Sequence, residues 1–338
     1  MKAIIKLIFG RFGILPHQIG ERLWHRVPIR KQSVHIILEA IINFIYKKRL
    51  NSAQPRKHSE VVIVFTDQLG LGDVLMLSPI INILMRHCRR PVVIASCFEC
   101  VFPEHLNSWK PLSYLEGSAK RRSLIIFPTF SSRNAALIIK YRFNFLGYLL
   151  TENISSNYTR LTGIGKIKNT DHYVDRITLI LEKMGIFHSV KETDYPEIKS
   201  TKMVLPRRKY VIVAPYAVWK ERCAGIDVIK AVLEKHFDPS YEIVIVGAAF
   251  KREMEYAKIV ENELLRQYNV TSLIGKTTLS EFCYLSRFAS GYVGNDTGSA
   301  HLAIASMCKK VIVLDGCVPY SLRIPKNKNL KNEIIFFA

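Results

Sequence analysis

The sequence predicts an α/β protein with two doubly wound parallel sheets, and three observations carry that prediction. Short apolar runs rich in β-branched residues alternate with amphipathic stretches from Val61 to Leu314. A polar, proline-containing stretch at residues 191–209 interrupts the alternation, which then restarts. The length of 338 residues is enough for two domains of about 100 to 200 residues each. Apolar strands separated by helices are typical of parallel sheets covered on both faces.

The first half of the alternation predicts a sheet with three strands. Apolar runs indicate the strands and amphipathic periodicity indicates the helices. The strands are expected at Val61–Phe65, Val92–Ala95 and Leu124–Phe127, and the helices at Leu75–His87, Asn134–Lys140 and Asp175–Met184. We therefore expect a first Rossmann-like domain over residues 59–195, followed by a linker within 191–209.

The second half predicts five strands that alternate with four helices, as in consecutive βα units, and a second domain over residues 205–338. The strands are expected at Tyr210–Ala214, Ile243–Val246, Ser272–Ile274, Tyr292–Gly294 and Val311–Leu314. The helices are expected at Ile226–His236, Lys251–Leu265, Ser280–Phe288 and Ser299–Ser306. Ligands of such sheets bind at the carboxyl ends of the strands, so we expect function in the strand-to-helix loops.

Residues 1–58 form a basic extension before the first predicted strand. They hold twelve lysines and arginines against two glutamates, a net charge of +10 out of the +21 of the whole chain. Within them, Val34–Tyr46 is apolar except for a stripe with a period of four residues, and Lys47, Lys48 and Arg49 follow directly. This pattern is typical of a helix lying on an anionic membrane surface, and a helix packed on the protein's own core is the alternative.

Composition also predicts a compartment. No run reaches the ~18 uninterrupted apolar residues of a membrane-spanning helix, and the apolar start lacks a cleavage site for export. The seven cysteines are odd in number and show no disulfide-scaffold density, which favours a reducing cytoplasm. We interpret Cys97 and Cys100 as two semi-buried thiols rather than as half of a metal site.

The first candidate loop runs from Thr66 to Asp73. Its glycines, Gly70 and Gly72, allow a tight turn and a close approach to a ligand. Asp73 lies at the start of the predicted helix, where its carboxylate could take a proton from a bound hydroxyl. Capping of the helix is the alternative role of this aspartate.

The second candidate loop runs from Val293 to His301, again between a strand and a helix. Asp296 and Thr297 are expected to cap the helix, and Gly298 allows close approach. The free N–H groups of the first helical turn suit a diphosphate. His301 lies about one turn into the helix on the face of Thr297, so it can reach the same ligand.

A third loop, Ala214–Lys220, places Lys220 just beyond a strand end, where its ammonium group could bind a phosphate. The chain has no G-x-x-x-x-G-K-[ST] loop and no third glycine after Gly70 and Gly72, so NTPase and hydride-transfer chemistry are not indicated. It also has no D-x-D pair near these strand ends, which favours metal-independent chemistry.

Several of these segments together resemble glycosyltransferase family 9, the heptosyltransferases of lipopolysaccharide core assembly. The resemblance is carried by Gly70–Pro79, the Lys220 loop, Leu273–Leu279 and above all Asn295–Ala303, and it runs from Val61 to Gly316. It implies the GT-B fold, which consists of two facing Rossmann-like domains. It also implies inverting, metal-independent transfer of heptose from ADP-heptose to a lipid-linked core sugar.

The resemblance also implies roles for individual residues. Asp73 matches the catalytic base, and Lys220 matches the phosphate-binding lysine. The matching donor-binding loop consists of Asp296, Thr297, Gly298 and His301. The chain departs from the family after Gly247, where Ala248, Ala249 and Phe250 stand in place of an acidic residue that holds the nucleoside.

The expected function is therefore transfer of heptose or a related sugar to lipopolysaccharide core or another surface glycan of the bacterial cell envelope. The expected partners are a nucleotide-sugar donor, a lipid-linked oligosaccharide acceptor and the anionic inner face of the cytoplasmic membrane, with no cofactor and no metal. A nucleotide-sugar 2-epimerase of the same fold is an alternative. A nucleic-acid-binding protein is another, although the sequence has no recognition motif for nucleic acid.

Overall fold

The structure is a computed structural model that describes the two sheets and the helices next to them. The described residues are 59–65, 70–96, 100–117, 123–126, 174–175, 178, 181–182, 185–217, 223–248, 251–314 and 333–337. The basic extension 1–58 and the predicted helix 134–140 lie outside these ranges. Within the predicted helix Asp175–Met184, the described residues are helical.

Contacts divide the chain into two compact units. Among the described residues, the first unit holds those up to Phe65, Leu77–Ser96 and His105–Val190. The second holds Gly70–Met76, Cys100–Glu104 and the residues from Lys191 onward. The segment around Asp73 therefore makes its contacts with the second unit.

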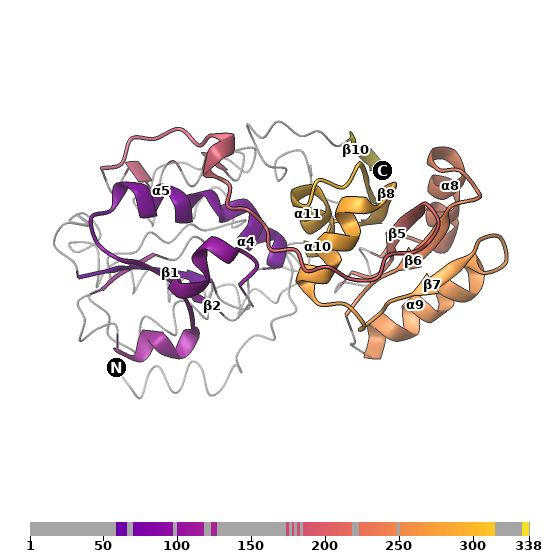
Figure 1. The fold of residues 1–338 in the computed structure, drawn as a ribbon, viewed down its shortest axis with the longest axis horizontal. Coiled ribbons are helices and arrows are strands. Elements are labelled where there is room, and N and C mark those ends of the chain that lie inside the picture. The colour runs from indigo at the N-terminus through magenta and orange to yellow at the C-terminus, as the bar shows by residue number, and fades with distance from the viewer. Residues whose placement is uncertain are drawn as a thin grey trace, which may run out of the picture. The chain divides into compact units, whose positions relative to one another are not determined.

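The first unit contains a four-stranded parallel sheet in the order β3-β2-β1-β4. Figure 1 labels its strands β1 and β2. Its strands are β1 (Val61–Phe65), β2 (Val92–Ser96), β3 (Trp109–Pro111) and β4 (Leu124–Ile126). The three predicted strands are confirmed. The sequence did not predict β3, because this edge strand has only three residues and includes Lys110 and a proline.

The helix predicted over Leu75–His87 is wrong as a single element. The structure has two helices, α4 (Leu71–Leu77) and α5 (Pro79–His87), with Ser78 between them. Proline has no N–H to donate within a helix, so Pro79 ends one helix and begins the next. The first helix begins before Leu75 because the carbonyl of Gly70 accepts the N–H groups of Asp73 and Val74.

Short 3-10 helices lie in the described connections between the longer elements. They are η2 (Pro103–Ser108), η3 (Leu112–Gly117) and η5 (Glu192–Asp194). Across the parts of the chain that the structure describes, no helix combines the length and the apolar character needed to cross a bilayer.

The second unit contains a six-stranded parallel sheet in the order β10-β9-β8-β5-β6-β7. Figure 1 labels its strands β5, β6, β7, β8 and β10. Its strands are β5 (Tyr210–Ala214), β6 (Glu242–Ile245), β7 (Val270–Ser272), β8 (Gly291–Asn295), β9 (Lys310–Leu314) and β10 (Glu333–Phe337). This is the doubly wound order of dinucleotide-binding folds, in which the chain changes direction between the first and fourth strands. The prediction missed β10, although its apolar residues Ile334 to Phe337 are visible in the sequence.

Within the described part of the second unit, four helices lie between the strands. They are α8 (Ile226–His236), α9 (Lys251–Leu264), α10 (Leu279–Phe288) and α11 (Gly298–Ala305). All four were predicted within two residues of these bounds. The start of α10 has a capping box, in which the Thr278 hydroxyl accepts the N–H of Glu281 and the Glu281 carboxylate accepts the N–H of Thr278.

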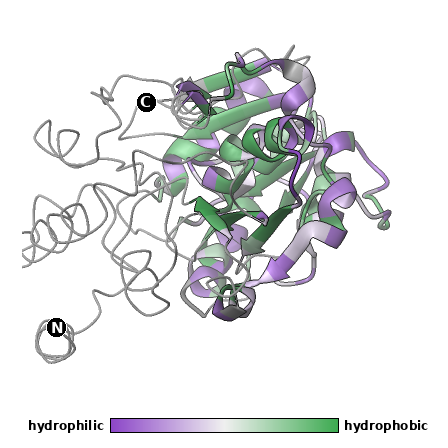
Figure 2. Ribbon diagram, turned by 90° about the vertical axis from the view of Figure 1, so that its left-hand side faces the viewer, coloured by the Kyte–Doolittle hydropathy of each residue, from purple (hydrophilic) through white to green (hydrophobic). Residues whose placement is uncertain are grey.

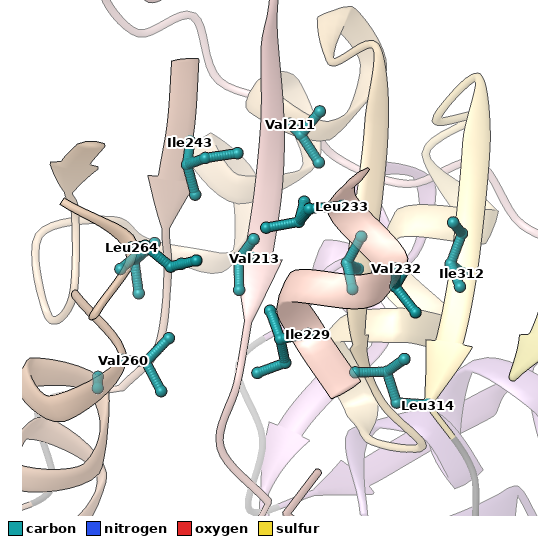
Figure 3. Packing of buried hydrophobic residues seen from close by; sticks show 13 residues of the cluster. Val211, Val213, Ile229, Val232, Leu233, Ile243, Val260, Leu264, Ile312 and Leu314 are labelled. Carbon is teal, nitrogen blue, oxygen red and sulfur yellow. The ribbon is translucent and has the colours of Figure 1, made fainter. Parts of the chain in front are cut away.

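The core of the second unit lies between its sheet and the helices α8 and α9 (Figure 3). Each helix presents apolar side chains at spacings of three, four and seven residues, such as Val260 and Leu264 of α9, and so buries a single stripe. Full burial of one such aliphatic side chain stabilises the fold by about 1.5 to 3 kcal/mol. The strands are mostly hydrophobic, whereas hydrophilic residues gather on the surrounding helices and loops (Figure 2).

Candidate functional site

Two of the predicted loops lie at the point where the second sheet changes direction. The neighbouring strands β5 and β8 pair with Ala214 opposite Gly294, and both carry a candidate loop at their carboxyl ends. In doubly wound sheets this crevice is where ligands bind. The strand order therefore brings the Asp296 loop and the loop that contains Lys220 to adjacent strand ends.

The turn between β8 and α11 forms a helix start suited to an anion. The carbonyl of Thr297, the N-cap residue, accepts the N–H of Ala300 at 3.1 Å and that of His301 at 3.4 Å. By helix geometry, the N–H groups of Gly298 and Ser299 then have no acceptor within the helix. These two groups and the positive end of the helix dipole would bind a phosphate oxygen.

The expected side-chain cap at Thr297 is not formed. Its hydroxyl lies 2.8 Å from the hydroxyl of Ser299, which in turn lies 2.8 Å from the phenol of Tyr292. Burial of Tyr292 raises the pKa of its phenol far above the usual range, so this side chain stays a neutral partner of Ser299. A row of three hydroxyls thus stiffens the first turn of α11.

Asp296 and His301 are buried together in the same turn. Their exposed fractions are 8% and 6%, and Asp296 Oδ1 lies 3.6 Å from His301 Nε2. That separation exceeds a normal hydrogen bond, so the two groups attract each other mainly when the imidazole is protonated. The structure thus brings together the carboxylate and the imidazole that the sequence assigned to one ligand site.

The start of α4 packs against this turn within the second unit. A Cβ at Gly72 would collide with the His301 ring and would lie 2.9 Å from its Nε2. A Cβ at Gly298 would lie 3.0 Å from that of Leu71. Both glycines are therefore required by contacts inside the protein, which is a reason that the sequence did not reveal.

Asp73 is the third residue of α4 and is half-buried. Its Oδ2 accepts the N–H of Gly70 at 2.7 Å, so Asp73 contributes to capping from the third helical position and not as the N-cap residue of the alternative role. A carboxylate has about four acceptor positions, and the bond from Gly70 uses one of them. A Cβ at Gly70 would lie 3.3 Å from this Oδ2, so Gly70 packs closely against the carboxylate.

The loop between β5 and α8 is described only at its two ends. Lys220 and Trp219 lie outside the described residues, so the position of the lysine stays a prediction. At the described ends, the thiol of Cys223 donates to the carbonyl of Ala217 at 3.4 Å, and its sulfur accepts the N–H of Ala217 at 3.3 Å. The chain that enters the loop therefore lies beside the chain that leaves it.

Sequence reasoning missed Asn295, the last residue of β8. Its side chain is fully buried and donates to the carbonyl of Pro215 at 2.8 Å. It also accepts the N–H of Ala224 at 2.9 Å. The available signal was a polar residue at the end of an otherwise apolar strand.

A second missed residue is Glu253, in the first turn of α9. It accepts the N–H of Ala248 at 2.9 Å, and Gly247 leaves the space that this carboxylate fills. Burial raises the pKa of Glu253, and the bond from Ala248 opposes that shift. The structure thus places a carboxylate beside the chain that follows β6, where the sequence after Gly247 offered none.

The described residues contain no candidate metal centre. Within the described ranges, no three His, Cys, Asp or Glu side chains lie close enough together to hold a metal ion. Three predicted site residues, Asp296, Thr297 and His301, share one turn with Gly298, and Gly70, Gly72 and Asp73 adjoin that turn. Metal independence itself stays a prediction.

Comparisons with known proteins agree with this architecture. Residues 168–321 match the family model described as "Glycosyltransferase family 9 (heptosyltransferase)". A search of curated protein sequences gives no match to the chain.

Solved structures share the fold. A family 9 glycosyl transferase from Veillonella parvula has 15% identity and a TM-score of 0.56, covering 82% of this chain and 86% of its own. ADP-heptose lipopolysaccharide heptosyltransferase II of E. coli has 16% identity and a TM-score of 0.57, with 82% and 90% covered. E. coli heptosyltransferase WaaC, solved with an ADP-heptose analogue, has 16% identity and a TM-score of 0.50, with 82% and 92% covered.

These similarities show the fold, and the family match covers strands β5 to β9 of the second sheet together with their strand-to-helix loops. Residues 168–321 therefore match glycosyltransferase family 9, the chain has a GT-B type α/β fold, and it is a glycosyltransferase.

Proposed function

We propose that this glycosyltransferase is an inverting, metal-independent enzyme that transfers heptose or a related sugar from a nucleotide sugar such as ADP-heptose. The acceptor would be lipopolysaccharide core or another lipid-linked surface glycan. The observation that supports this most is the β8–α11 turn, where a helix start, a buried Asp296 and a buried His301 meet at the ligand-binding edge of a family 9 domain.

The donor's diphosphate would bind at the start of α11. Its charge increases as the bond to the sugar breaks, so groups that bind the departing anion lower the barrier. The N–H groups of Gly298 and Ser299 supply such contacts, and Lys220 would supply an ammonium group. Fixed dipoles and a lysine would thus stabilise the departing diphosphate, as a metal ion does in other enzymes.

Asp73 would act as the general base. Inversion requires the acceptor hydroxyl to attack the anomeric carbon from the face opposite the diphosphate. The hydroxyl proton would pass to the Asp73 carboxylate, the new bond from oxygen to carbon would form, and the diphosphate would leave with the electron pair. The bond from Gly70 holds the Asp73 carboxylate in a fixed orientation for this transfer.

Glu253 would contribute to binding of the nucleoside. In doubly wound folds, an acidic group after the second strand of the sheet accepts hydrogen bonds from ribose hydroxyls. Here β6 occupies that place in the strand order, and Glu253 lies beside the chain that follows it.

The acceptor would bring the enzyme to the inner face of the cytoplasmic membrane. The basic residues 1–58 would hold it there as a peripheral protein, because clustered lysines and arginines attract anionic lipids. Nucleic acid is not among the proposed partners.

A screen of donors tests the proposed function directly. A ligand that binds only the folded state raises the unfolding temperature by mass action. We expect ADP and ADP-heptose to stabilise the protein more than UDP, GDP or CDP do. Absence of stabilisation by any nucleotide, or turnover of a nucleotide sugar without an acceptor, would contradict a glycosyltransferase acting on such a donor.

A further inference from the structure

We propose that His301 is a positioning residue for the general base, because its imidazole holds the first turn of α4, and with it Asp73, against the first turn of α11. The inference rests on the proposed function, since Asp73 is the base only in that reaction. It goes beyond the donor-binding role that the family resemblance implies for this histidine, because it links the histidine to the proton transfer.

The imidazole of His301 lies directly against the backbone of Gly72. A Cβ at Gly72 would overlap the ring carbon Cδ2 and would lie 2.9 Å from Nε2 and 3.1 Å from Cγ. One edge of the ring therefore occupies the space that a side chain at this position would need. The ring is only 6% exposed, so the surrounding packing keeps it in this contact.

Gly298 holds the same segment of α4 from a second point within the second unit. A Cβ at Gly298 would lie 3.0 Å from the Cβ of Leu71 and 3.4 Å from the backbone nitrogen of Gly72. Gly298 and His301 are three residues apart at the start of α11, so they lie on one face of that helix. Two neighbouring contacts thus fix Leu71 and Gly72 on the first turn of α11.

Asp73 is tied to this segment by two hydrogen bonds. Its N–H donates to the carbonyl of Gly70 at 3.0 Å, and its Oδ2 accepts the N–H of Gly70 at 2.7 Å. Residues 70–73 therefore form one closed turn, and Gly72 lies inside it. A shift of Gly72 relative to the imidazole would move the carboxylate of Asp73 as well.

Asp296 stabilises one orientation of the imidazole. Its Oδ1 lies 3.6 Å from Nε2 of His301, and its side chain is buried beside the ring. Nε2 is also one of the ring atoms nearest to the Cβ position of Gly72. Attraction between the carboxylate and a proton on Nε2 therefore favours the orientation in which this edge of the ring faces α4.

These contacts join the base to the turn that would bind the diphosphate. A general base must lie within hydrogen-bond reach of the hydroxyl that it deprotonates, at about 2.6 to 3.2 Å. A misplacement of about 1 Å costs on the order of 100-fold in rate. Removal of the His301 ring would therefore slow the chemical step even when the donor is bound.

The experiment compares kcat of the unaltered chain, His301→Ala, Gly72→Ala and the variant with both changes. The assay uses saturating ADP-heptose and lipid-linked core oligosaccharide, at a temperature where circular dichroism shows every variant to be folded. We expect each single change to lower kcat by about 10- to 100-fold. The double variant should be about tenfold faster than either single variant, because the methyl group added at Gly72 fills the space that the ring leaves.

A second cycle tests whether His301 acts through Asp73. In Asp73→Asn the base is already removed, so His301→Ala should slow transfer by less than about a further threefold. A contact of His301 with the donor alone would instead have its full effect in both backgrounds.

Two more variants complete the experiment. His301→Gln keeps more of the side-chain volume and should retain more turnover than His301→Ala, so it tests the inference even if His301→Ala does not fold. His236→Ala is the matched control, because His236 lies at the end of α8, with Lys310 as a neighbouring charge, outside the α11 turn. It should keep the unaltered kcat.

Three results would overturn the inference while slow transfer by Asp73→Asn leaves the proposed base in place. They are an unaltered kcat in the folded His301 variants, a double variant no faster than His301→Ala, and full additivity with Asp73→Asn. Transfer by Asp73→Asn at the unaltered rate, or no transfer by the unaltered chain, would contradict the proposed function and the inference together.

Discussion

The missing β-carbon of Gly72 is what lets the start of α4 lie against the imidazole of His301. From the sequence we expected the glycines of this loop to allow a ligand to approach. The sequence could not show that one of them packs against a histidine ring more than two hundred residues away. Asn295 was missed for the same reason, because its partners are backbone groups of another loop. Glu253 was missed although its partner, the N–H of Ala248, lies only five residues earlier in the chain. Motif spacing identifies residues on one loop, whereas contacts between loops depend on the strand order.

Gly72→Ala tests the contact with His301. The added methyl group must displace the imidazole or the start of α4, and overpacking of this kind costs about 1 to 3 kcal/mol of unfolding free energy. We also expect weaker stabilisation by ADP, because His301 shares a turn with the phosphate-binding helix start. Urea unfolding with and without ADP measures both effects.

Gly225→Ala is the control for that measurement, because a Cβ at Gly225 has no neighbour within 4 Å. Unfolding of Gly72→Ala at the same urea concentration as the unaltered protein would show that the glycine and the imidazole do not touch.

At the scale of elements, the sequence predicted the second unit better than the first. The helices α8 to α11 have capping residues or glycines at their ends, or a clear apolar stripe along their length. The local sequence signals therefore agree with the tertiary packing. The prediction over Leu75–His87 failed because the periodicity continues across Pro79 while the backbone hydrogen bonds do not. The strand β3 was missed because edge strands need little apolar character.

His236, the last residue of α8, is expected to make the stability of the fold depend on pH. Burial, Lys310 and Lys235 lower the pKa of His236, and Glu333 opposes them weakly. The folded state therefore disfavours the protonated imidazole relative to the unfolded chain, whose histidine has a pKa near 6.5. This contribution to stability is complete above that pH and is lost as the pH falls through the lower, folded value.

His236→Gln should remove this part of the pH dependence. We expect the free energy of unfolding to fall less between pH 7 and pH 5 in the variant than in the unaltered chain, as measured by urea titrations at each pH. A larger fall in the variant would mean that the folded state favours the charged imidazole.

At the scale of the whole molecule, the basic charge divides into two parts. Residues 1–58 carry +10 of the +21, and the remainder is distributed over the two units that form the enzyme. Composition could predict this division, but it could not decide whether the extension binds lipid or protein, and residues 1–58 lie outside the described structure. The assignment to a membrane surface therefore depends on experiment.

Deletion of residues 1–58 tests that assignment. The truncated protein should bind less to sedimented vesicles that contain anionic phospholipid, and high salt should weaken binding of the full chain in the same way. Equal sedimentation of the full and truncated chains would mean that the extension is structural.

Glycosyl transfer with Asp73 as the general base is tested most directly by the turnover of Asp73→Asn. The assay follows transfer from ADP-heptose to a lipid-linked core oligosaccharide, with ADP affinity measured in parallel. Asp227→Asn is the control, because Asp227 is also an acidic residue in the first turn of a helix. We predict that Asp73→Asn binds ADP normally and transfers sugar at least about 100-fold more slowly, whereas Asp227→Asn transfers at the unaltered rate. Transfer by Asp73→Asn at the unaltered rate would contradict the account.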